Sequence, residues 1–175
     1  MQKPKIAILG ASGIGRFHAR EFNNAGCNVS AILGSSQSSA EKTAAMLEKE
    51  FSIKAAPYHE LGLLIEREKP EAVSICTPPQ FHEEQIRDCL NSGIHVFCEK
   101  PLVLGKNRDY DTAKPLFTLA NKEKLVLTVN TQWPAILSYI HPGELRTFSV
   151  YMEPGLKGLE MRSDHLPHAN SLLVK

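Results

Sequence analysis

AVSICTPPQFHEEQIRDCLNSGIHVFCEKPLVL, residues 72–104, is the stretch that decides the fold. It begins with a short apolar run that ends at two prolines, which can neither continue a strand nor open a helix at once, so the chain must turn there. Apolar residues at helical spacing follow, Gly93 is placed to end that helix, and residues 95–98 predict a second buried strand. Ligands bind outside the carboxyl ends of the strands in open parallel sheets, so chemistry is expected in the loops at 77–79 and 99–101.

The composition is that of a soluble globular protein with one domain and a small surplus. The chain has 175 residues, of which 42% are hydrophobic and 22% are charged. A formal net charge of +1 without a basic run argues against nucleic acid and against an anionic membrane as partners. No apolar run reaches the roughly 20 residues that span a bilayer, and a first strand that starts at Lys5 leaves no room for a signal peptide. We therefore expect a cytoplasmic protein.

The four cysteines carry no pattern that is typical of a metal site. They are Cys27, Cys76, Cys89 and Cys98, and no two of them form a Cys-x-x-Cys pair. Because they lie in or beside predicted strands and helices, they favour buried thiols in a reducing compartment. Metal ligation is the lesser alternative, since no clustered ligand spacing exists.

A glycine turn after the first predicted strand is typical of a dinucleotide-binding site. Residues 5–9 predict a strand that leads straight into the turn at 10–15, and a helix follows that ends at Gly26. Gly10 permits the tight turn, and Gly15 permits close packing of the helix on the strand. The amides and the positive dipole end of the helix N-terminus favour phosphate there, although Ser12 replaces the usual middle glycine. The candidate cofactor-binding residues are Gly10, Ser12, Gly13, Ile14 and Gly15. A plain tight turn is the alternative, and one side of the helix carries Ile14, Phe17, Phe22 and Ala25.

The loop after the second strand bears on the choice of dinucleotide. An NAD-specific fold usually places an acidic residue there, against the ribose 2′-hydroxyl, and this chain has none. Ser35 and Ser36 could instead receive a 2′-phosphate without repelling it, so the sequence favours NADP over NAD, although no arginine is adjacent. The alternative is a serine-rich turn that caps the next helix, and Ser38 with Glu41 has the spacing of a capping box.

The rest of the pattern completes an alternation of strands and helices. Further strands are predicted at 29–33, 53–56 and 125–129, and further helices at 40–51, 58–69 and 106–121. Pro115 must sit in the first turn of the last helix or kink it. Six strands with helices between them predict an α/β fold, a doubly wound parallel (Rossmann) sheet.

Three segments carry a resemblance to a known family. They are GASGIGRFH at 10–18, Thr77-Pro78-Pro79 with His82, and GIHVFCEKPL at 93–102. The chain resembles the Gfo/Idh/MocA family of NAD(P)-dependent oxidoreductases, named for glucose-fructose oxidoreductase, inositol dehydrogenase and a rhizopine-catabolism protein. The resemblance implies an NAD(P)-binding Rossmann domain at 1–129. Members also carry a second α+β domain, of which residues 130–175 would be the start or a truncated remnant.

The resemblance also implies a site and a reaction, the transfer of a hydride between a nicotinamide and a sugar, cyclitol or related polyol or carbonyl compound. Lys100 would donate a hydrogen bond to the substrate oxygen, and His168 would exchange the proton. Asp164, four residues earlier on the same helix face, would orient or stabilise the imidazole of His168. The residues implied to border the cofactor are Thr77, Pro78, His82, Glu99 and Lys100. A cis bond before Pro101 is expected as well. The alternatives are a surface lysine at 100 and a solvent-exposed histidine at 168.

Three classes of function remain open at this point. The first is the oxidoreductase itself, acting on a small-molecule substrate. The second is a dinucleotide-binding module or remnant without turnover, because most of the second domain is absent from the sequence. The third is a structural fragment that binds nothing well. A homo-oligomer formed through residues 130–175 is a further open alternative.

Overall fold

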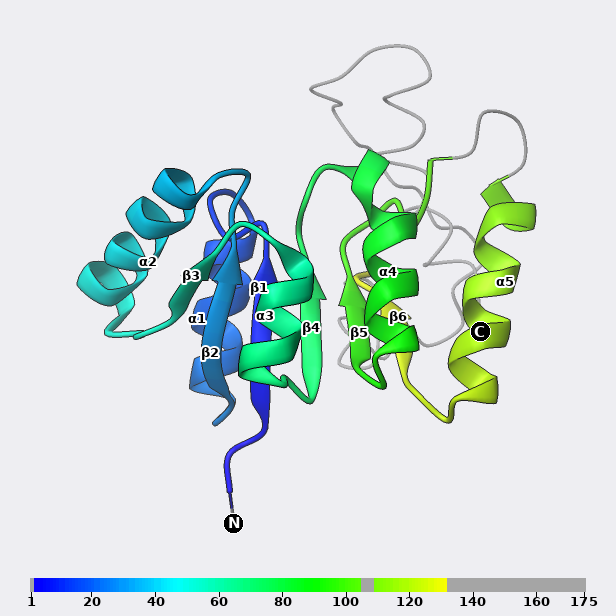
Figure 1. The fold of residues 1–175 in the computed structure, drawn as a ribbon, viewed down its shortest axis with the longest axis horizontal. Helices are drawn as coiled ribbons and strands as arrows, with labels where there is room; N and C mark the ends of the chain where they lie inside the picture. Colours follow the sequence, from blue (N-terminus) through cyan, green and yellow to red (C-terminus); the bar gives the residue numbers. More distant parts are fainter. Residues whose placement is uncertain (1, 105–108, 132–175) are drawn as a thin grey trace, which may run out of the picture.

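The computed structural model describes residues 2–104 and 109–131, and within them it shows a six-stranded parallel sheet in the order β3-β2-β1-β4-β5-β6 (Figure 1). The strands are β1 (Lys5–Leu9), β2 (Asn28–Leu33), β3 (Ala56–Tyr58), β4 (Ala72–Ile75), β5 (His95–Cys98) and β6 (Leu127–Val129). The helices are α1 (Gly15–Asn24), α2 (Gln37–Phe51), α3 (Leu61–Glu68), α4 (His82–Asn91) and α5 (Asp109–Lys122), with a 3₁₀ turn η1 (Pro79–Phe81) before α4. The predicted doubly wound Rossmann sheet is confirmed.

Two hydrophobic layers hold the helices on opposite faces of the sheet. One layer joins α3, α4 and α5 to the sheet, and its fully buried side chains include Leu64, Ile86 and Leu116. The other joins α1 and α2 to the sheet through Ala19 and Leu47. Each fully buried Leu or Ile stabilises the fold by roughly 1.5–3 kcal/mol through area removed from water. Figure 1 shows α3 and α4 on the near face and α1 behind the sheet.

Strand register brings three loops to one edge of the sheet. Leu9 at the end of β1 pairs with Ile75 at the end of β4, and Ile75 pairs in turn with Cys98 at the end of β5. The loops that follow these strands therefore start side by side. From β1 the chain continues outward to β2 and β3 on one side of the sheet, and from β4 it continues outward to β5 and β6 on the other side. The carboxyl edge between β1 and β4 is therefore the topological switch point, where such folds bind ligands.

Several predicted boundaries are wrong, and β3 is the largest error. The strand lies at 56–58 instead of 53–56, and Ile53 is a buried core residue before it. Pro57 within β3 is tolerated because β3 is an edge strand. The cap of α2 is Ser36 and not Ser38: the extended Ser36 accepts a bond from the amide of Ser39 at 3.2 Å.

The other elements differ from the predictions by a few residues. Helix α3 begins at Leu61, three residues later than predicted, and β6 is shorter than predicted. Pro115 lies inside α5, not in its first turn. The four cysteines are free thiols, and Cys89 and Cys98 are buried.

Some predictions lie outside the described residues. These include the roles of Asp164 and His168 and the content of a second domain at 130–175. Within residues 2–104 and 109–131, no helix is long and apolar enough to cross a bilayer. The same residues contain no group of three or more side chains that could hold a metal ion.

Candidate functional site

The glycine loop after β1 packs directly on the loop after β4. Gly10 has a φ of +84°, and a Cβ there would lie 2.8 Å from the carbonyl oxygen of Cys76 and from the amide nitrogen of Thr77. A Cβ on Gly15 would overlap the carbonyl oxygen of Gly10. Both positions therefore require glycine, as the sequence predicted. At Gly13, by contrast, no atom of the described residues beyond its two chain neighbours lies within 4 Å of the position of a Cβ.

A cavity of about 450 Å³ opens beside this loop at the carboxyl ends of β1, β2 and β4. It brings together five of the predicted cofactor-binding residues, which are Gly10, Ser12, Ser35, Thr77 and Pro78. Sequence reasoning missed four further polar side chains on its wall: Ser39, Thr43, His59 and Gln85. The predicted cofactor-binding residue Ser36 does not line the cavity, and its hydroxyl caps α2.

The N-terminus of α1, where the helix dipole is positive, adjoins this loop. Ile14 is its N-cap residue, no side chain in the part of the chain that the structure describes caps it, and its first turn holds no acidic residue. The first amides of a helix lack intrahelical partners, and the helix dipole is positive there. The arrangement suits a phosphate group.

The loop after β5 is built around the carboxylate of Glu99, which is 11% exposed. Its Oε1 accepts hydrogen bonds from His18 Nε2 at 2.9 Å and from the side-chain amide of Asn130, which follows β6. Its Oε2 accepts from the backbone amide of Lys100 at 3.2 Å. Burial raises the pKa of Glu99, but these donors more than offset it and hold the pKa below its ordinary value.

His18, from α1, is the cationic partner of this carboxylate. Its Nδ1 lies 2.8 Å from the hydroxyl of Ser74 and 3.3 Å from the sulfur of Cys76, both on the β4 side. Burial alone would lower the pKa of His18, but hydrogen bonds to Cys76 and Glu99 raise the pKa to about 9. At neutral pH, His18 and Glu99 are therefore an internal ion pair.

His82 begins α4 and is fully buried between two loops. Its Nε2 lies 2.8 Å from the carbonyl oxygen of Thr77, and its Nδ1 lies 2.9 Å from the carbonyl oxygen of Pro101, so whichever nitrogen carries the proton donates to one of the two loops. The imidazole thus joins the loop after β4 to the loop after β5. A direct contact of His82 with a cofactor stays a prediction.

Lys100 follows the ion pair at the same edge. The residue is half-buried, and its bond to Pro101 is cis, as the resemblance implied. A parallel sheet therefore aligns a glycine loop, a polar cavity and a lysine along the carboxyl ends of β1, β4 and β5.

Comparison with protein families identifies this arrangement. The oxidoreductase family with an NAD-binding Rossmann fold, Gfo/Idh/MocA, matches residues 4–131. The chain belongs to this family. The described sheet, the cavity and Lys100 all lie within the matched part.

Individual relatives agree with this membership. The chain is 42% identical over 72 residues to an uncharacterized oxidoreductase of Schizosaccharomyces pombe, a match that covers 41% of this chain and 18% of the relative. It is 30% identical over 100 residues to the inositol 2-dehydrogenase of Paracoccus denitrificans, covering 56% of this chain and 29% of the enzyme. The chain thus spans less than a third of these relatives.

A solved structure extends the comparison to the fold. The UDP-N-acetylglucosamine 3-dehydrogenase of Acidithiobacillus ferrooxidans superposes with a TM-score of 0.62 at 26% identity, over 79% of this chain and 43% of that one. The likeness agrees with the parallel α/β sheet described above.

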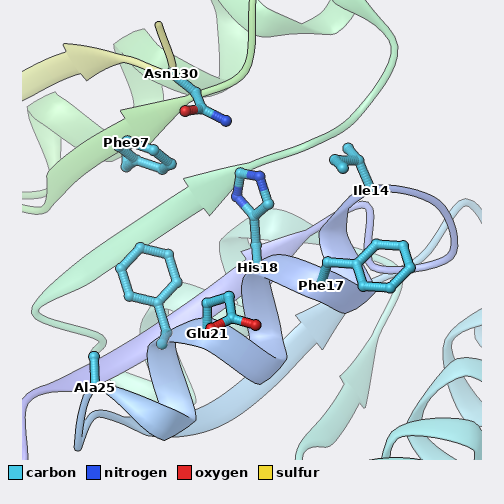
Figure 2. A pocket seen from close by; sticks show the side chains of 8 residues that line it. Ile14, Phe17, His18, Glu21, Ala25, Phe97 and Asn130 are labelled. Carbon is cyan, nitrogen blue, oxygen red and sulfur yellow. The ribbon is translucent and has the colours of Figure 1, made fainter. Parts of the chain in front are cut away.

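A second pocket, of about 460 Å³, lies along the outer side of α1 (Figure 2). Its walls include the four residues predicted to share one side of this helix: Ile14, Phe17, Phe22 and Ala25. That side is not closed by the described residues, since Ile14 is 48% exposed and Phe17 is 37% exposed. The predicted cofactor residue Ile14 therefore lines this apolar pocket and not the polar cavity. Figure 2 shows the His18 ring rising from α1 toward Phe97 and Asn130.

Two members of the site were not predicted to act in it. His18 stands in the matching segment at 10–18, yet its partner is 81 residues away, so only the folded structure pairs it with Glu99. Asn130 directly follows β6, and its place after a parallel strand is a signal that sequence reasoning could have used.

The stability that His18 contributes is expected to fall as the pH rises from about 6.5 to about 9. The folded-state pKa is raised, so the contribution is complete below the unfolded pKa and is lost as pH passes the folded pKa. The full contribution is on the order of 3 kcal/mol. Urea unfolding of wild type and His18→Gln across this pH range measures it as the difference between the two proteins. His95→Gln, at an exposed histidine on the other edge of the sheet, is the control. Parallel pH curves for wild type and His18→Gln would contradict the ion pair.

Proposed function

We propose that this chain binds a nicotinamide dinucleotide along the carboxyl ends of β2, β1, β4 and β5. The bound dinucleotide would exchange a hydride with a sugar, cyclitol or related polyol or carbonyl compound, and Lys100 would assist this transfer. The observation that carries the proposal is that the glycine loop packs on Cys76 and Thr77. The polar cavity lies beside this contact toward β2, and Lys100 follows the neighbouring strand β5.

The residues present fit such a cofactor. Gly13 leaves open space in which a pyrophosphate could approach the backbone, and the uncapped end of α1 would favour its charge. The adenosine half would occupy the cavity beside Ser35. A nicotinamide supplies the hydride chemistry when bound, and Thr77, Pro78 and Glu99 are proposed to border it.

Lys100 is proposed to stabilise negative charge on the substrate oxygen. An ammonium group at the edge where the nicotinamide would lie can donate a hydrogen bond that strengthens as the alkoxide forms. The family resemblance adds His168 as the group that exchanges the proton and Asp164 as the group that orients His168. The relatives named for inositol and for a UDP-sugar support a polyhydroxylated substrate.

The cavity favours NADP as the preferred form. The side chains at its β2 and β3 end are Ser35, Ser39, Thr43 and His59, and among residues 2–104 and 109–131 no carboxylate lines the cavity. A 2′-phosphate would therefore meet hydroxyl and imidazole donors without like-charge repulsion from the wall.

Fluorescence titration tests the proposal. NADPH is expected to bind at least as tightly as NADH, and Ser35→Asp should shift the preference toward NADH by about tenfold, or about 1.4 kcal/mol, by repelling the 2′-phosphate. Ser38→Asp adds the same charge at an exposed residue of α2 outside the cavity and is the control. A tenfold preference of the wild type for NADH would refute the NADP assignment, and binding of neither dinucleotide would refute the function.

A substrate panel separates the oxidoreductase from a binding module without turnover. Cyclitols, hexoses and UDP-sugars are offered with each oxidised dinucleotide, and the reduced nicotinamide is followed by its absorbance. Turnover of one of these classes supports the oxidoreductase. Tight dinucleotide binding without turnover across the whole panel would instead support the module.

A further inference from the structure

We propose that His18 and His82 are positioning residues that clamp the Glu99–Pro101 loop from two sides and thereby fix Lys100 for the reaction. The inference rests on the proposed function, because Lys100 is the group being positioned. It assigns roles to the half-buried His18 and the fully buried His82, which the hydride transfer itself does not use.

The first arm of the clamp reaches the loop from α1. His18 donates to Glu99 Oε1, the neighbouring Asn130 amide does the same, and Glu99 Oε2 holds the backbone amide of Lys100. The ring is kept in place by Ser74 on one side and by the tilted ring of Phe97, 5.6 Å away, on another. The titratable groups that face His18 are Cys76 and Glu99. A protonated ring therefore fixes the residue that precedes Lys100.

The second arm reaches the loop from α4, on the opposite face of the sheet. One nitrogen of His82 lies 2.9 Å from the carbonyl oxygen of Pro101, the residue that follows Lys100. The other nitrogen lies 2.8 Å from the carbonyl oxygen of Thr77, which lines the polar cavity, and the nitrogen that carries the proton donates to one of the two. The same ring therefore ties the cavity wall to the loop of Lys100, so a shift of one loop is passed to the other.

The two arms contact the immediate neighbours of one functional residue. Both rings lie at the carboxyl edge, and all four of their nitrogens lie within hydrogen-bond distance of groups near this edge. A buried polar group that loses its hydrogen-bond partner destabilises the protein, so the loop prefers the clamped position. A displacement of a reacting group by about 1 Å can cost about 100-fold in rate.

The test uses the full chain with four variants: His18→Leu, His18→Gln, His82→Leu and His82→Gln. The leucine variants are expected to lower kcat by about 10- to 100-fold while the Kd of the dinucleotide changes less than about threefold. Glutamine at 18 can still donate to Glu99 and should restore part of the loss. His95→Gln, an exposed histidine of β5, is the control and should keep wild-type kcat.

A second readout needs neither cofactor nor turnover. The rate at which acetic anhydride labels Lys100 in the cofactor-free protein, followed by mass spectrometry, should change at least about threefold in the leucine variants, and the rate at exposed Lys54 should not. If a leucine variant does not fold, the corresponding glutamine variant decides: it replaces only part of the contacts of the ring, so a Lys100 labelling rate equal to that of the wild type would count against the clamp.

The outcomes separate this inference from the proposed function. Wild-type protein that binds no dinucleotide would refute the proposed function, and Lys100 labelling would still show whether the clamp holds. Wild-type kcat together with unchanged Lys100 labelling in folded His18 and His82 variants would overturn the clamp and leave the function standing.

Discussion

Replacing Lys100 by alanine is expected to lower kcat about 100-fold or more, while the Kd of the dinucleotide changes less than about tenfold. The lysine follows β5 at the edge where the glycine loop and the loop of Thr77 also meet. A donor at this point acts on charge that develops only in the transition state, so its loss appears in kcat and not in cofactor binding. Steady-state kinetics on the best substrate of the panel, with fluorescence titration of the dinucleotide, measure both quantities.

Two further variants sharpen this prediction. Lys54→Ala removes an exposed lysine between α2 and β3, at the opposite edge of the sheet, and should leave kcat unchanged. Lys100→Arg keeps the positive charge but replaces a compact ammonium by a planar fork, so it should restore little of the rate. Equal kcat for wild type and Lys100→Ala would remove Lys100 from the reaction.

The parts of the fold that the sequence predicts well are those with strong local signals. A glycine turn between a strand and a helix, two prolines after β4 and a glycine after α4 mark boundaries through backbone geometry alone. The weak point was β3, where Pro57 argues against a strand and Ile53 looks like part of one. Tertiary contacts decide there, because β3 pairs through Ala56 with Ala31 of β2 at the sheet edge.

The site is less predictable than the fold because its contacts are long-range. Sequence reasoning places Lys100, Glu99 and the glycines at one edge through the rule for parallel strands, and the structure confirms that placement. It cannot assign partners to His18, whose two nitrogens are satisfied by residues 56 and 81 positions away. Nor does it show that the apolar side of α1 lines a pocket together with Phe97 of β5, since helical periodicity only groups residues on a side.

Gly15→Ala is expected to destabilise the fold by about 3 kcal/mol and to abolish tight dinucleotide binding. A Cβ at residue 15 would overlap the backbone carbonyl of Gly10 and lie 3.1 Å from the Cβ of Cys76. The first obstacle is backbone, so α1 must move away from β1 and weaken the layer around Ala19. The loop that would hold the phosphates would move with it. Urea unfolding and fluorescence titration give the two effects.

Other glycines of the chain separate the causes of this loss. Gly26→Ala, at a φ of +88° and with no described atom beyond its chain neighbours within 4 Å of the new Cβ, isolates backbone strain and should cost about 1–2 kcal/mol without affecting binding. Gly10→Ala combines a φ of +84° with contacts at 2.8 Å and should cost more than Gly26→Ala. Gly13→Ala meets open space, so stability should change by less than about 1 kcal/mol, yet dinucleotide binding should weaken because the Cβ fills the phosphate approach. A Gly15→Ala protein as stable as Gly13→Ala would show that α1 does not rest on the glycine loop as the structure places it.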